Sequence, residues 1–240
     1  MRTRLLNVLI VITLLGLTGC GGASAIAKSG KGRVTSDVAE VDLTESVAGN
    51  SAFAFDLYQA LREKEGNLFY SPYSISVALA MTYAGARNET ERQMAETLHF
   101  ILSQERLHPA LNGLDLELSS RGQGAKGKDG EGFRLSIANS IWGELDYKFL
   151  DQFLDVLAQN YGAGLRLLDF VKAPEDSRVV INDWVSDETE ERIKDLLPEG
   201  SVTSDTRLVL TNAIYFNAAW MYPFAEEATR DGTFHLLNGS

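Results

Sequence analysis

Cysteine and clusters of basic residues are almost absent from this sequence. The chain of 240 residues has a single cysteine, Cys20, so no disulfide can form within it. Its 22 Lys and Arg residues are outnumbered by 33 Asp and Glu residues, which gives a formal net charge of −11. Because phosphate binding needs clustered Lys and Arg, which we do not find, we expect no nucleic-acid partner.

Motifs for catalysis or metal binding are also missing. His99, His108 and His235 lie far apart without the spacing of metal ligands, and no Gly-x-Ser-x-Gly motif indicates hydrolase chemistry. The Gly-rich segment ending at Lys128 resembles a phosphate-binding loop, but Asp129 stands where Ser or Thr would bind magnesium. This segment neither follows an apolar strand nor opens a helix. We therefore predict a protein that is not an enzyme, with no catalytic residue, metal or cofactor.

The first residues have the features of an export signal. Arg2 and Arg4 precede an apolar run, Leu5–Leu17, which is too short for the roughly 20 residues of a membrane-spanning helix. The run ends in Leu17-Thr18-Gly19-Cys20, a lipobox, so we expect residues 1–19 to be a signal peptide and Cys20 to carry a lipid. An uncleaved anchor with an incidental cysteine is the alternative. The expected location is the bacterial cell envelope, facing outward, with contact to the membrane only through Cys20 and the extracellular space as the alternative.

Residues 20–44 consist mainly of Gly, Ala, Ser, Lys and Val without a sustained period, which predicts a flexible tether before a folded domain at 45–240. In that domain, helices and strands alternate irregularly, which favours the α+β class over regular βαβ winding. Apolar periodicity and stop signals predict helices beginning near Glu45 and at 72–84, 88–98, 103–118, 148–161 and from Pro174, and strands at 68–70, 133–141, 165–170 and 208–220.

Three segments resemble the serpin family of serine-protease inhibitors. The first, Asn67–Ser76 followed by Ala84–Arg87, resembles the serpin strand-to-helix core. The second, Ile181–Val185 with Thr189 and Ile193, resembles the helix that crosses the front of the main sheet. The third, Leu210–Asn217 with Trp220, Pro223, Phe224 and Thr229, resembles the third strand of that sheet and its exit. Their order and spacing cover about residues 46–238, and they imply the serpin fold, with a large central sheet and surrounding helices.

The resemblance also implies a function and its residues. In the family, a protease cleaves an exposed reactive loop, which then inserts into the main sheet as a new strand while still acylated to the enzyme. Serine proteases are therefore the expected partners, and the full-length protein is expected to be a monomer. By resemblance, Ser71, Ser74 and Asn212 belong to the shutter, where buried polar groups hold the central strands together until insertion. Trp220 resembles the residue of the breach, at the top of the sheet, where entry of the loop begins. Asn182 and Thr189 lie on the crossing helix.

The chemistry of these residues supports some roles more than others. An asparagine in the middle of an apolar strand is costly to bury unless it is bonded, and a hydroxyl at a helix start is a natural partner for Asn212. Ser71 is equally explained as a plain N-cap and Trp220 as an ordinary core residue. Asn182 could equally face solvent.

The sequence stops at Ser240, before the region where the family's reactive loop lies. We therefore expect this chain to be the amino-terminal part of a serpin, incomplete at its C-terminal end, with no reactive centre of its own. Two alternatives remain open. One is a degenerate, non-inhibitory protein that binds other molecules through exposed sheet edges. The other is an inhibitor of papain-like cysteine proteases.

Overall fold

The computed structural model describes residues 25–35, 37–121, 134–218, 220, 222 and 224–235. Its described strands form one sheet in the order β1-β3-β2-β4. The long strands β2 (Arg134–Glu144) and β4 (Leu208–Asn217) pair antiparallel from Arg134↔Asn217 to Gly143↔Leu208. The short strand β3 (Leu165–Leu168) runs parallel to β2, and β1 (Ala25–Ala27) runs antiparallel to β3.

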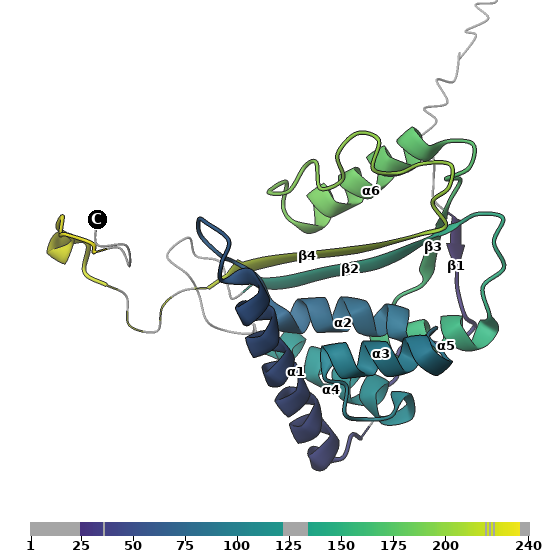
Figure 1. Cartoon of the computed structure of the whole chain (residues 1–240), viewed down its shortest axis with the longest axis horizontal. Helices are drawn as coiled ribbons and strands as arrows, with labels where there is room; N and C mark the ends of the chain where they lie inside the picture. Colours follow the sequence, from purple (N-terminus) through teal and green to yellow (C-terminus); the bar gives the residue numbers. More distant parts are fainter. Residues whose placement is uncertain are drawn as a thin grey trace, which may run out of the picture.

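Helices cover both faces of this sheet (Figure 1). Helix α6 (Pro174–Glu188) crosses one face, and the other helices pack beneath the opposite face. The mixture of paired strands and helices confirms the predicted α+β class. The helices of the lower layer are α1 (Glu40–Leu61), α2 (Pro72–Tyr83), α3 (Asn88–Leu98), α4 (Gln104–Ser120) and α5 (Asp151–Tyr161), and a short 3-10 helix, η1 (Glu226–Ala228), lies near the end of the chain.

Helix α2 is the buried centre of the lower layer, as its apolar composition predicts. The Ser71 hydroxyl caps its first turn, and Pro72 occupies the first helical position, where a missing N–H costs nothing. Ala80 packs with the other helices, whereas Met81 packs with Ile141 of β2. The helix therefore joins the helical layer to the middle of the sheet.

Several predicted elements differ from the structure. Residues 68–70 are not a strand; Phe69 is 81% exposed, and the described residues offer no partner strand to form a ladder. Strand β4 ends at Asn217 rather than at Trp220. Helix α1 begins at Glu40 rather than near Glu45, with Glu40 and Asp42 in its first turn, where carboxylates are favoured by the helix dipole.

The predicted tether is wrong for residues 25–35, which dock on the domain, and for residues 40–44, which are helical. Beyond the β1 pairing, Arg33 donates to Asn112 Oδ1 at 2.8 Å and to Asp115 Oδ2 at 2.6 Å. Lys31 forms an ion pair with Asp155 at 2.7 Å. These partners belong to α4 and α5, so the segment joins the edge of the sheet to the helical layer. Small, aperiodic residues do not reveal such distant partners, which is why the composition was misleading.

Among the residues that the structure describes, no helix is both long enough and apolar enough to span a bilayer. The predicted signal peptide, Cys20 and the Gly-rich segment at Lys128 lie outside the described residues.

Candidate functional site: a polar cluster between helix α2 and the sheet

A cluster of three polar side chains, Ser74, Asn139 and Asn212, lies where α2 meets β2 and β4. Asn139 and Asn212 are register partners, so their side chains leave the same face of the sheet directly opposite each other. The Asn212 side-chain amide donates to Asn139 Oδ1 at 2.6 Å, to the Ser74 carbonyl at 3.2 Å and to the Ser74 hydroxyl. Asn139 also donates to the Ser74 carbonyl, at 3.4 Å. One helix and two strands are thus cross-linked through a single group of hydrogen bonds.

Burial makes this cluster energetically important. Ser74 is 0% exposed, and the apolar side chains of Met81 and Ile141 lie in the same layer between helix and sheet. Leaving a buried amide or hydroxyl without a partner costs about 1–3 kcal/mol. The Ser74–Asn139–Asn212 cluster therefore stabilises one arrangement of α2, β2 and β4, and a shift of any of the three elements would leave the buried Ser74 hydroxyl and the half-buried asparagine amides without these partners.

Ser71 contributes indirectly. Its hydroxyl accepts a hydrogen bond from the Ser74 backbone N–H at 3.2 Å, which is the geometry of an N-cap. It thereby fixes the first turn of α2 and the position of Ser74. The structure thus brings Ser74 and Asn212 together directly, with Ser71 supporting them from the helix start.

Asn182 of α6 is buried and does not face solvent. Its amide donates to the Leu197 carbonyl at 2.9 Å, and its Oδ1 accepts from the Leu197 N–H at 2.8 Å. Thr189, at the end of α6, donates to the Val185 carbonyl at 2.7 Å and accepts from the Ile193 N–H at 3.2 Å. Both residues therefore hold the segment that follows α6 against the helix.

Helix α6 approaches the sheet closely because the strands present small residues to it. Val185 packs against Ala138 of β2 and Ala213 of β4. Beside this contact, the ring of Trp184 meets that of Trp142 edge-on, with centroids 5.5 Å apart. The indole N–H of Trp142 donates to Thr211 Oγ1 at 3.1 Å, a buried side-chain bond between β2 and β4.

Trp220 lies beyond the end of β4 and is not a core residue. Its side chain is 72% exposed and meets Phe224 edge-on, with ring centroids 5.8 Å apart. The structure does not bring it to the Ser74–Asn139–Asn212 cluster, because β4 ends before it. Its predicted breach role stays a prediction.

Two further residues, Asn139 and Glu144, are not predicted as site residues by the sequence. In the sequence, Asn139 is one residue of an alternating strand pattern, and only its register with Asn212 reveals the pairing. Glu144 is 4% exposed and accepts from the Phe170 backbone N–H at 2.8 Å, so it ties the end of β2 to the chain after β3. A carboxylate at the end of an apolar strand was the signal that could have found it.

A second polar contact lies within the helical layer. His108 Nδ1 and the Tyr161 hydroxyl are 2.6 Å apart. Burial lowers the pKa of His108 to about 4, so the imidazole is neutral near pH 7, and burial raises the pKa of Tyr161, so the phenol stays protonated. The phenol therefore donates and the imidazole accepts. Within the described ranges, no cluster of His, Cys, Asp or Glu could hold a metal ion.

Comparison with known proteins places this geometry in a family. The profile described as "Serpin (serine protease inhibitor)" matches residues 48–240. A leukocyte elastase inhibitor from Sus scrofa is 43% identical over 191 residues, which cover 79% of this chain and 48% of that protein. An uncharacterized serpin-like protein from Methanosarcina mazei is 32% identical and aligns with 98% of this chain and 55% of its own length.

Solved structures agree. The thermophilic serpin tengpin in its native state superposes with a TM-score of 0.72 at 26% identity, covering 90% of this chain and 52% of that one. Emu (Dromaius novaehollandiae) ovalbumin gives a TM-score of 0.68 at 30% identity, with 79% and 51% covered. This chain therefore spans about half the length of the relatives it matches. The family is one of protease inhibitors rather than enzymes, and the predicted serpin fold is confirmed. The chain belongs to the serpin family.

Proposed function

We propose that this chain is part of an inhibitor of serine-type endopeptidases that acts by reactive-loop cleavage, loop insertion and covalent trapping of the protease. Its relatives include proteins named leukocyte elastase inhibitor, which supports protease inhibition in general. The observation that carries the mechanism is the Ser74–Asn139–Asn212 cluster, which binds α2 to the centre of the sheet.

Strand β4 is the last strand in the order of the described sheet. A segment that adds beside β4 gains hydrogen bonds along Leu208–Asn217, and this gain drives insertion. Insertion also requires the sheet to move against α2. The Ser74–Asn139–Asn212 cluster couples β4 to α2 and β2, so in this proposal it sets a local barrier that delays insertion until the loop is cut.

Helix α6 contributes to the same barrier from the other face. It packs on Ala138 and Ala213 through Val185, and Asn182 and Thr189 keep the following segment in place. A sheet that gains a strand must shift under this helix. In this proposal, the two residues keep α6 and the segment that follows it together while the sheet shifts.

The experiment uses the polypeptide encoded by the complete reading frame, because this chain spans about half of its relatives. The protein is incubated with elastase-, trypsin- and chymotrypsin-type serine proteases and with papain, and complexes that survive boiling in detergent are sought. We expect a stable complex with at least one serine protease. Complexes with papain alone would support the cysteine-protease alternative and overturn the serine-type proposal. The 240-residue chain serves as the comparison.

A second candidate, binding without inhibition, is favoured by exposed aromatic side chains at and beyond the end of β4. Phe216 is 60% exposed, Trp220 72% and Phe224 80%. Exposed apolar groups beside a sheet edge favour association with other chains. Cleavage of the full-length protein by every serine protease without any stable complex, combined with concentration-dependent association, would favour this candidate.

We also propose that the protein is a cell-envelope lipoprotein anchored through Cys20 and facing outward. The basic residues Arg2 and Arg4, the apolar run Leu5–Leu17 and the lipobox ending at Cys20 support this location.

A further inference from the structure

Part of the edge of β2 lies open beside β3. Strand β3 is short and covers only Trp142, Gly143 and Glu144 of β2, and no other described strand pairs with this side of β2. The Glu144 N–H donates to the Arg207 carbonyl on the β4 side at 3.0 Å. Because backbone groups alternate along a strand, those of Ile137 and Asn139 point to the opposite, β3 side. They form an open edge on which another strand can pair.

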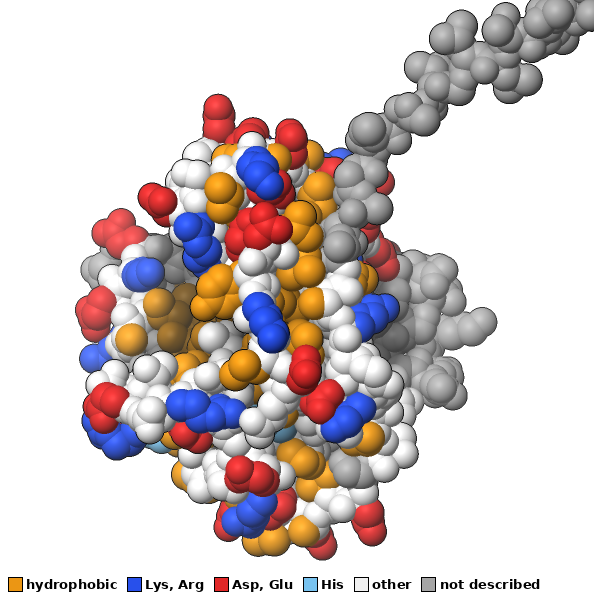
Figure 2. Space-filling model, turned by 90° about the vertical axis from the view of Figure 1, so that its right-hand side faces the viewer, with side chains coloured by type: hydrophobic (Ala, Val, Ile, Leu, Met, Phe, Trp, Pro, Cys, Tyr) orange, Lys and Arg blue, Asp and Glu red, His pale blue; other side chains and the backbone are white. Residues whose placement is uncertain are grey.

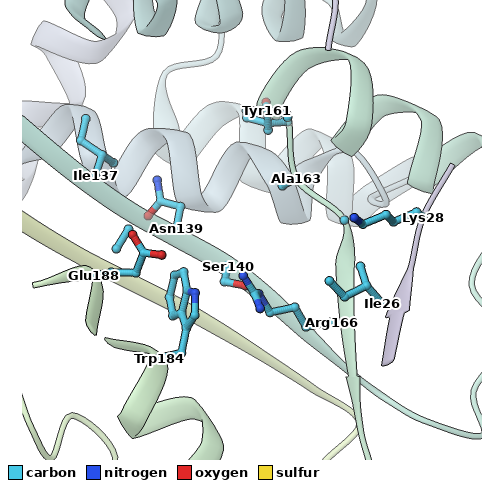
Figure 3. A pocket seen from close by; sticks show the side chains of 13 residues that line it. Ile26, Lys28, Ile137, Asn139, Ser140, Tyr161, Ala163, Arg166, Trp184 and Glu188 are labelled. Atoms are coloured by element: carbon cyan, nitrogen blue, oxygen red, sulfur yellow. The ribbon is translucent and has the colours of Figure 1, made fainter. Parts of the chain in front are cut away.

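A cavity of about 310 Å³ runs along this edge (Figure 3). Its walls come from β2 residues 137–140, from Tyr161 at the end of α5 and residues 162–164 before β3, and from Arg166 and Trp184. It lies on the β3 side of the molecule, where acidic and basic side chains are interspersed around exposed hydrophobic groups (Figure 2). The cavity is therefore a groove, and the backbone N–H and C=O groups of Ile137 and Asn139 lie along its base.

Arg166 lies beside two indole rings in this groove. Its guanidinium carbon lies 5.3 Å from the ring centroid of Trp142 and 5.2 Å from that of Trp184. A guanidinium beside aromatic rings keeps the N–H donors at its edge available for planar acceptors such as carboxylates. Among the ion pairs of the described residues, none includes Arg166 or Lys28, the other cation in the groove. A preorganised donor of this kind selects an anionic partner.

The charges are arranged along the groove. Lys28 and Arg166 lie toward β3, whereas Glu188 of α6 lies farther along β2, near the part of the strand that carries Ile137 and Asn139 (Figure 3). An acidic group is therefore attracted at the β3 end and repelled at the Glu188 end. An isolated anion would leave the backbone groups of the β2 edge unused, but an extended peptide with one acidic side chain satisfies both.

We propose that this groove binds an extended segment of another protein, which adds as a strand to the open edge of β2 and places a carboxylate against Arg166. The main-chain ladder holds the segment, and Arg166 selects the acidic side chain. This binding is separate from protease inhibition, because it uses neither the β4 edge nor the Ser74–Asn139–Asn212 cluster.

The test uses the full chain and capped, fluorescein-labelled peptides of about six residues, the common length of a strand. The first peptide alternates valine and threonine and has one glutamate near one end. The second has glutamine in place of that glutamate, and the third is the glutamate peptide with N-methyl groups on alternate amides, which blocks pairing. Fluorescence anisotropy measures each affinity.

We expect the glutamate peptide to bind about tenfold more tightly than the glutamine peptide, which corresponds to one charge-assisted hydrogen-bonded pair, and the N-methylated peptide not to bind. Arg166→Gln should remove the preference for glutamate, and Arg166→Lys should keep only part of it. Arg192→Gln, which changes an exposed arginine outside the groove, should leave it unchanged.

Equal affinity for the glutamate and glutamine peptides would overturn the proposal and leave Arg166 as a packing residue between two indoles. Binding of the N-methylated peptide, or no binding of the glutamate peptide, would overturn strand addition. If circular dichroism shows that Arg166→Gln fails to fold, the affinities of the three peptides for the unaltered chain still test the proposal.

Discussion

The side chains of Asn139 and Asn212 face each other across β2 and β4, with Nδ2 of Asn212 2.6 Å from Oδ1 of Asn139. This contact lies under the first turn of α2, so it joins the pairing of the strands to the position of the helix.

Removing Asn212 from this contact should destabilise the protein. Asn212→Ala leaves the Asn139 carbonyl and the Ser74 hydroxyl without their partner, so we expect the free energy of unfolding to fall by about 1–3 kcal/mol in urea titrations. The exposed Asn67→Ala serves as the control and should change it by less than about 0.5 kcal/mol. Equal effects of the two substitutions would show that the cluster has no stabilising role.

The docked segment 25–35 should depend on Asn112. This residue is 0% exposed, accepts from Arg33 and donates to the Val34 carbonyl at 2.7 Å. We expect Asn112→Ala to cost about 1–3 kcal/mol and to expose residues 25–35 to limited proteolysis. A variant with unchanged stability and unchanged cleavage in this segment would contradict the docking.

His108 should make stability depend on pH. Burial holds its folded-state pKa at about 4, against about 6.5 for an exposed histidine, while the charge of Glu105 opposes this shift. The unfolded chain therefore binds the proton first, so this contribution is complete above about pH 6.5 and is lost as the pH falls toward 4, by up to about 1.4 kcal/mol per pH unit.

The measurement compares urea unfolding at pH 7 and pH 5 for the parent, His108→Gln and the exposed His235→Gln. We expect the loss between these pH values to be smaller in His108→Gln and unchanged in His235→Gln. Identical losses in all three proteins would contradict the assignment to His108.

Gly49 of α1 should not tolerate a side chain. A Cβ at this position would lie 2.3 Å from the backbone carbonyl oxygen of His99, which cannot turn away as a side chain can. We expect Gly49→Ala to destabilise the protein by about 1–3 kcal/mol despite its better helix propensity. The matched control is Gly113→Ala in α4, where the nearest atom is a Val38 methyl at 3.2 Å. If thermal unfolding gives the same midpoint shift for both variants, the close approach of Gly49 to His99 is not the cause of the destabilisation.

Lipid attachment is tested by Cys20→Ser. In the proposed lipoprotein, this change prevents acylation, so the protein should leave the membrane fraction of the bacterial host and appear in the soluble fraction. Immunoblots of the two fractions measure this, with the parent protein as the comparison. Unchanged retention of Cys20→Ser in the membrane fraction would contradict anchoring at this residue.

The sequence predicted the secondary-structure elements and the fold class better than the contacts between side chains. The start of α2 was readable from Ser71 and Pro72, because capping is a local property. The Ser74–Asn212 contact was predicted by family resemblance and chemical need. Asn139 was missed because its partnership depends on the register of β2 with β4, which involves residues more than 70 positions apart.

The docked segment 25–35 also depends on distant residues that its own sequence does not reveal. Residues 25–35 carry no sustained period, and their order comes from Asn112, Asp115 and Asp155 on distant helices. The groove at Arg166 likewise requires β3 to be shorter than β2. Neither property can be read from a local pattern of apolar residues.

The pairing of β1 with β3 also limits how far the sheet can lie from Cys20. Ala25, the first residue of β1, is only five positions after Cys20, and five residues span at most roughly 18 Å when fully extended. In a protein acylated at Cys20, the edge of the sheet formed by β1 would therefore stay close to the lipid headgroups. A protease would have to reach this molecule at the surface of the cell, with the β1 side turned toward the bilayer.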